Sequence, residues 1–98
     1  MSIPIKERRD DIIYFLLNKV KHLENQPQTV SFFVDDFENK VVEQNEVQQH
    51  LKYVIETGYL QGSANDTGTG DDAPLAVCEN ARITNEGEQA LRTKFFKV

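Results

Sequence analysis

The sequence predicts an α+β domain, and three features of its second half carry the prediction. A helix with one apolar face, at residues 44–57, stops at Gly58 and passes directly into a strand. A loop rich in glycine and aspartate, at residues 61–74, follows that strand. A returning strand at 75–83 then leads straight into a closing helix. Because the chain has 98 residues, we expect residues 1–98 to form a single domain.

The first helix is expected at about residues 6–24. Six apolar side chains in this segment recur at spacings of three and four, which places them on one wide helical face. They are Ile12, Ile13, Leu16, Leu17, Val20 and Leu23. Acidic residues near the start and basic residues near the end of the segment suit the helix dipole.

The segment after Pro27 carries two different periodicities. Apolar residues first alternate, as in a strand, and then Phe33, Phe37 and Val41 recur at intervals of four, as in a helix. We therefore expect a short extended stretch at 29–32, followed by a second helix at about 33–41.

The third helix is expected at about residues 44–57. Its apolar residues Val47, Leu51 and Val54 follow the spacing of a helix that lies on a core. Gly58 comes directly after them and can adopt the left-handed conformation that ends a helix.

The hairpin that follows is expected to run along residues 59–62 and to return along 75–83. The connecting loop contains glycines, a proline and no large apolar side chain, which favours a flexible connection. Thr84 can cap the last helix, expected at about 85–96, and glutamates in its first turn suit the helix dipole.

Two phrases of the sequence resemble the winged helix-turn-helix superfamily, in particular its small bacterial or phage-type members. HLKYVIETGYL, at residues 50–60, is similar to the end of a recognition helix that enters the wing. ITNEGEQAL, at residues 83–91, is similar to the segment that leaves the wing and opens the closing helix. The resemblance covers about residues 8–96 and implies three helices, a small antiparallel β-hairpin wing and a C-terminal helix. This fold serves DNA-binding regulators and protein-docking modules alike.

The resemblance implies a non-enzymatic DNA-binding transcriptional regulator whose third helix enters the major groove. The outward positions of that helix would be Gln44, Asn45, Gln48, Gln49 and Lys52. Glutamine and asparagine make paired hydrogen bonds to adenine, which favours this function. The glutamates at 43, 46 and 56 face a single lysine in the same helical segment, which disfavours it.

The charge distribution supports an alternative function. The net charge is −5, and the expected wing carries Asp66, Asp71 and Asp72 without any lysine or arginine. DNA would repel such a wing. The chain could instead be an acidic interaction module or inhibitor that docks on a basic partner protein, with these aspartates steering the encounter. The sequence leaves both functions open.

A homodimer is a further expectation. Tyr14 and Phe15 lie beside the apolar face of the first helix and exceed what one buried face needs. Together with Phe95 or Phe96 of the C-terminal helix, they could pair two copies of the chain.

Neither catalysis nor a metal or other cofactor is expected. His22, His50 and Cys78 match no zinc pattern, and nothing in the sequence builds a cleft for a cysteine–histidine pair. The acidic loop at 65–72 lacks the spacing of the helix–loop–helix calcium motif. No apolar run reaches the ~20 residues that cross a bilayer, and no secretory signal is recognised. A single cysteine then makes the cytoplasm the expected compartment.

Overall fold

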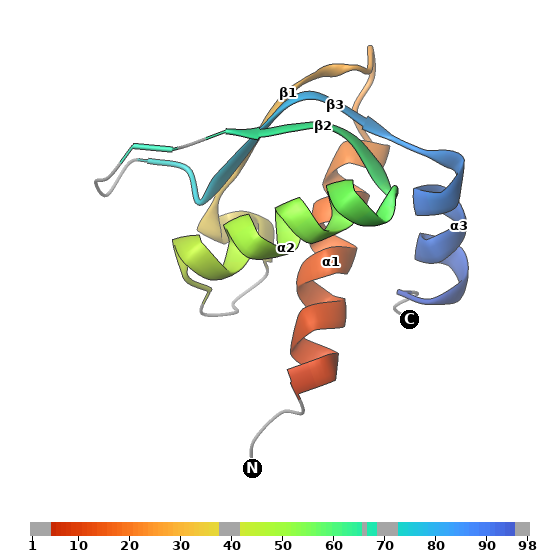
Figure 1. Ribbon diagram of the computed structural model, residues 1–98, viewed down its shortest axis with the longest axis horizontal. Coiled ribbons are helices and arrows are strands. Elements are labelled where there is room, and N and C mark those ends of the chain that lie inside the picture. Colours follow the sequence, from red (N-terminus) through yellow and green to blue (C-terminus); the bar gives the residue numbers. More distant parts are fainter. Residues whose placement is uncertain (1–4, 38–41, 66, 69–72, 96–98) are drawn as a thin grey trace.

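The computed structural model describes residues 5–37, 42–65, 67–68 and 73–95. Its elements in chain order are α1 (Ile5–Lys21), β1 (Gln28–Phe32), the short 3-10 helix η1 (Val34–Phe37), α2 (Gln44–Thr57), β2 (Leu60–Asn65), β3 (Ala76–Ile83) and α3 (Asn85–Thr93). Within this part of the chain, three α-helices accompany one antiparallel sheet, so the α+β class is confirmed. Helices α1 and α2 lie against one face of the sheet, and α3 lies at its end (Figure 1).

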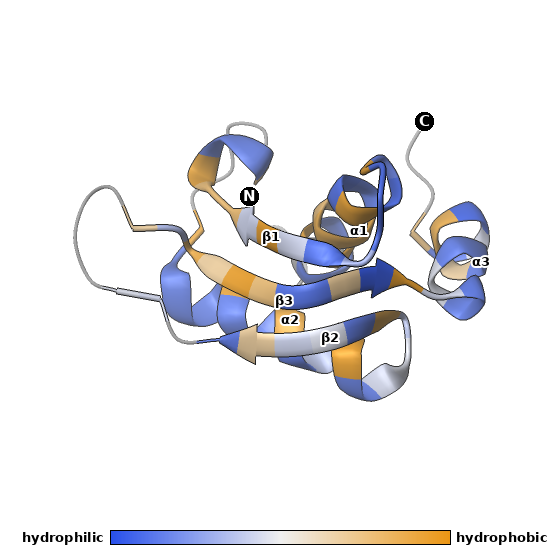
Figure 2. Ribbon diagram, turned by 90° about the horizontal axis from the view of Figure 1, so that it is seen from above, coloured by the Kyte–Doolittle hydropathy of each residue, from blue (hydrophilic) through white to orange (hydrophobic). Residues whose placement is uncertain are grey.

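The sheet has the strand order β1-β3-β2, so the last strand is the central one (Figure 2). Strand β3 pairs antiparallel with both neighbours, and Cys78 lies opposite Val30 on one side and Ala64 on the other. Strand β1 occupies the segment where the sequence predicts only a short extended stretch. The hairpin therefore belongs to a larger sheet.

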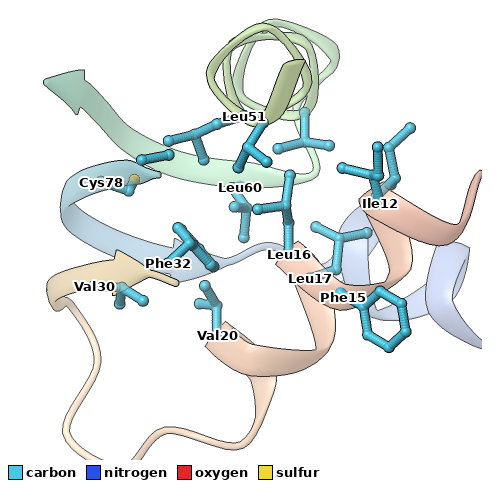
Figure 3. Close-up of a cluster of buried hydrophobic side chains, with 14 of the residues drawn as sticks. Ile12, Phe15, Leu16, Leu17, Val20, Val30, Phe32, Leu51, Leu60 and Cys78 are labelled. Carbon is cyan, nitrogen blue, oxygen red and sulfur yellow. The ribbon is translucent and has the colours of Figure 1, made fainter. Parts of the chain in front are cut away.

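The core lies between the sheet and helices α1 and α2 (Figure 3). Side chains spaced by three and four along α1 meet alternate side chains of the strands, because helices and strands present one face at these two periods. The fully buried members include Ile12, Leu16, Leu17, Val20, Phe32, Leu51, Leu60 and Cys78. This apolar cluster fixes α2 against the sheet.

Helix α2 ends at Gly58 in the left-handed conformation, with φ of +92°. The Gly58 amide donates to the carbonyl of Ile55 at 3.1 Å, and the Tyr59 amide donates to that of Val54 at 2.9 Å. These bonds satisfy carbonyls that the end of a helix leaves without partners. The chain then enters β2 at Leu60, one residue after the start that the sequence predicts.

Thr84 joins the start of α3 to the start of the hairpin. Its hydroxyl oxygen accepts a hydrogen bond from the Gly87 amide at 3.0 Å and lies 2.6 Å from the Gly58 carbonyl oxygen, to which the hydroxyl donates. Its backbone amide donates to the Tyr59 carbonyl at 3.1 Å. Gly87 sits so close to Tyr59 that a Cβ on it would collide with the carbonyl oxygen of Tyr59.

The helix predicted at 33–41 is wrong in its described part. Val34–Phe37 form a single 3-10 turn, and residues 38–41 lie outside the described residues. The Asp36 carboxylate accepts hydrogen bonds from the Phe33 amide and from Lys19 Nζ, both at 2.7 Å. Phe33 is 44% exposed whereas Phe37 is fully buried, so these two side chains do not share a helical face.

Two helices are shorter than the sequence predicts, and one strand is longer. Helix α1 ends at Lys21 instead of residue 24, and α3 ends at Thr93 instead of residue 96. Strand β2 continues to Asn65, beyond the predicted end at residue 62. At the end of α1, the side-chain amide of Gln26 donates hydrogen bonds to the carbonyls of Val20 and Leu23.

Candidate functional site

One stripe of α2 faces directly away from the core. A helix turns by about 100° per residue, so positions separated by four, three and four residues return to nearly the same direction. Starting from Asn45, this stripe lies opposite the buried residues Val47, Leu51 and Val54. Its members, called the outer stripe here, are Asn45, Gln49, Lys52 and Glu56, and all four are exposed.

Gln44 and Gln48 point along one flank of α2, toward the loop that joins β2 to β3. The side-chain amide of Gln48 donates to the hydroxyl oxygen of Thr67 at 3.1 Å. The amide of Gln44 bonds to the same oxygen and lies 3.2 Å and 3.3 Å from the carbonyl oxygens of Gly68 and Pro74. We call Gln44, Gln48 and Thr67 the loop clamp. The clamp occupies amide donors of two of the five residues that the sequence assigns to DNA.

The opposite flank of α2 faces α1. Tyr53 lies there and is 41% exposed. The guanidinium carbon of Arg9, in the first half of α1, lies 5.7 Å from the centroid of the Tyr53 ring. An arginine over a tyrosine ring at this distance is a cation–π contact. On the same flank, His50 Nδ1 lies 2.7 Å from the Glu46 carbonyl oxygen, so this nitrogen carries the proton.

Arg9 and Tyr53 are absent from the residues that sequence reasoning selects for binding. Tyr53 follows Lys52 and could have been found by the same angular counting that separates the outer stripe from the buried face. Arg9 could not have been placed in this way, because its contact with α2 is made across the interface of two helices far apart in sequence.

The glutamates of α2 fall into two groups. Glu43 occupies the N-cap position and Glu46 the first turn. Negative charges at that end stabilise a helix through its dipole, so these two residues have a structural role. Glu56 belongs to the outer stripe, where it is the one acidic member beside Lys52. The outer stripe itself thus carries one acidic and one basic side chain, while Glu43 is exposed at the N-terminal end of the helix.

Asp66, Asp71 and Asp72, the candidates for docking on a basic partner, lie outside the described residues. Thr67 and Gly68 of the same loop are described, and the clamp holds them beside the first half of α2.

Two of the aromatic residues that motivate a homodimer, Phe15 and Phe95, pack within the chain. Phe15 is buried, and its ring meets that of Phe37 edge-on with 6.0 Å between centroids. Phe95 meets Tyr59 in the same way at 6.0 Å. Phe96 lies outside the described residues.

Among the described residues, no group of three or more histidine, cysteine, aspartate or glutamate side chains could hold a metal ion. Cys78 is buried in β3, and loss of solvation raises the pKa of its thiol, against the smaller lowering effect of a hydrogen bond with the Ser63 backbone. No helix in the described part of the chain has the length and apolar character that a membrane span needs.

Comparisons of the chain with protein-family models, with curated proteins and with solved structures found no match.

Proposed function

We propose that this chain is a non-enzymatic DNA-binding transcriptional regulator of the winged helix type. Two arrangements support the proposal: α2 leads through one glycine into the hairpin, and β1 joins that hairpin as a third strand. In a winged helix, this order gives the helix before the hairpin the recognition role. The hairpin beside α2 then serves as the wing.

The observation that carries the proposal is the composition of the outer stripe. Asn45 and Gln49 present two amides one helical turn apart, and Lys52 adds a positive charge on the same line. Four residues of helix rise by ~6 Å, which is close to two base-pair steps. The two amides could thus reach base edges about two steps apart in the major groove, where such side chains pair with adenine.

Gln44 and Gln48 take a different role in this proposal. Their amides hold Thr67, so they fix the position of the loop relative to α2 and do not read bases. Base reading falls to Asn45 and Gln49, and Lys52 contacts phosphate.

The test is selection of bound sequences from a pool of random DNA duplexes, first with the unchanged protein and then with Asn45→Ala/Gln49→Ala. The proposal expects an enriched motif that the double variant no longer selects. Gln61→Ala is the matched control, because Gln61 is an exposed amide on the outer face of β2. An unchanged protein that enriches no motif and binds no duplex at low salt would overturn the proposal.

The alternative function, docking on a basic partner protein, draws support from the net charge of −5 and from the loop clamp. The clamp keeps the start of the acidic loop beside α2, so helix and loop would meet a partner together. Changing Asp71 and Asp72 to lysine separates the two functions. A DNA-binding protein should bind duplexes more tightly after this change, whereas a docking module should lose its basic partner in a pull-down.

A further inference from the structure

We propose that Arg9 and Tyr53 form a phosphate-contact site that holds one strand of the nucleic acid beside the outer stripe of α2. This inference rests on the proposed function and adds the interface through which the sugar-phosphate backbone is held. It assigns backbone contact to the N-terminal half of α1, instead of to the acidic loop.

The geometry starts from the two flanks of α2. Tyr53 lies on the flank that faces α1, and α1 packs against α2 (Figure 1). Its neighbour Lys52 belongs to the outer stripe, so both side chains are exposed at the same level of the helix. Arg9, also exposed, lies over the Tyr53 ring at 5.7 Å. One arginine, one lysine and one phenol are therefore collected along a single edge of the exposed stripe.

The chemistry of this edge suits a phosphate group. The planar guanidinium of arginine matches the two free oxygens of a backbone phosphate, and the phenol of tyrosine can donate a further hydrogen bond to one of them. The ring of Tyr53 also orients Arg9, because the cation–π contact restricts a long side chain that would otherwise sample many rotamers. An oriented arginine loses less conformational entropy when it binds.

The two flanks differ in what they offer to DNA. A helix in the major groove has a phosphate strand on each side, and contacts to these strands fix its orientation. The loop flank is occupied by the clamp, and its loop continues into a sequence with Asp71 and Asp72. The α1 flank carries the cation and the phenol, and its one acidic residue on α2, Glu46, lies two turns before Tyr53 in the first turn of the helix. The strand on the α1 side is therefore the one that this protein holds.

The test uses nonspecific binding, which does not require a known target sequence. Anisotropy of a labelled duplex of mixed sequence gives the affinity across about 50 to 200 mM salt, and the slope of log K against log salt counts phosphate contacts. Arg9→Ala should reduce the magnitude of this slope by about 1. Tyr53→Phe keeps the ring and removes the hydroxyl, so binding should weaken with little change in slope, because no counterion is involved.

Arg82→Ala is the matched control, because it removes one exposed positive charge from β3, on the face of the sheet away from α2. Its slope should equal that of the unchanged protein. If Arg9→Ala also leaves the slope unchanged, or if Arg82→Ala lowers it equally, the phosphate site is refuted while DNA binding by the unchanged protein still supports the proposed function. If the unchanged protein binds no duplex, the proposed function fails and the phosphate site fails with it.

Discussion

The side-chain amide of Gln48 donates a hydrogen bond to the hydroxyl oxygen of Thr67, 3.1 Å away. This bond ties the middle of α2 to the loop between β2 and β3. It also places side-chain amides of α2 that look equivalent in the sequence in different environments. The amides on the loop flank are engaged by the chain itself, whereas Asn45 and Gln49 on the outer stripe are exposed.

Thr67→Val should loosen the loop clamp without changing the shape of the side chain. The hydroxyl oxygen that accepts from Gln44 and Gln48 is lost, and a partly buried hydrogen bond of this kind contributes about 1 kcal/mol. We expect the free energy of unfolding in urea to fall by about that amount. Thr29→Val is the control, because Thr29 is exposed on β1. Equal stability of the two variants would show that the clamp does not stabilise the fold.

Gln49→Ala and Gln44→Ala should have different effects on DNA recognition. An amide that pairs with a base contributes about 1–3 kcal/mol of discrimination, so Gln49→Ala should relax the preference at one base pair. Gln44→Ala should instead leave base preference unchanged, because that amide is bound to the loop. Binding to a set of single-base variants of the selected duplex measures both. A loss of base preference in Gln44→Ala would mean that the clamp opens on DNA.

Gly87→Ala should destabilise the protein, because Gly87 is buried against the hairpin. The added methyl group would collide with the Tyr59 carbonyl oxygen and press against Ile83. Overpacking of this kind costs about 1–3 kcal/mol, and thermal unfolding should show a correspondingly lower midpoint. Gly68→Ala is a matched control, since a Cβ at Gly68 would meet no atom within 4 Å. A stable Gly87→Ala variant would contradict the close approach of α3 to the hairpin.

The thiol of Cys78 should make the fold sensitive to alkaline pH. Burial raises the pKa of this thiol above its ordinary value of 9.0, so the folded chain holds the proton more tightly than the unfolded chain does. The resulting stability is fully present below the unfolded pKa and is lost as the pH rises through the folded pKa. Urea unfolding between about pH 8 and 10 should show this decline.

Cys78→Ala is the comparison for that experiment. The variant is expected to be less stable at every pH, because a buried side chain becomes smaller. Its stability should nevertheless change less between neutral and alkaline pH than that of the unchanged protein. Parallel pH profiles for the two proteins would show that another group causes the decline.

The features that the sequence predicts well depend on neighbours along the chain. Helix α2 follows from the spacing of its apolar residues, its end from Gly58, and the start of α3 from Thr84. Each of these signals acts within about one helical turn, so no knowledge of tertiary structure is required.

The features that the sequence does not predict depend on residues far apart in the chain. The turn at Val34–Phe37 is held by the contact between Lys19 and Asp36, which comes from α1. Strand β1 becomes part of the sheet only because it pairs with β3. The different environments of Gln44 and Gln49 arise from a loop that folds back on one flank of α2. The local periodicity of a segment carries no information about these contacts with distant residues.

The hydroxyl of Thr84 contacts the carbonyl oxygens of Gly58 and Tyr59 and also caps α3. Release of this single group would loosen the base of the hairpin and the first turn of α3 together. Helix α3 therefore does not open as an independent segment. In native-state hydrogen exchange, the Gly87 amide should be protected to the same degree as the central amides of β3, as members of one cooperative unit.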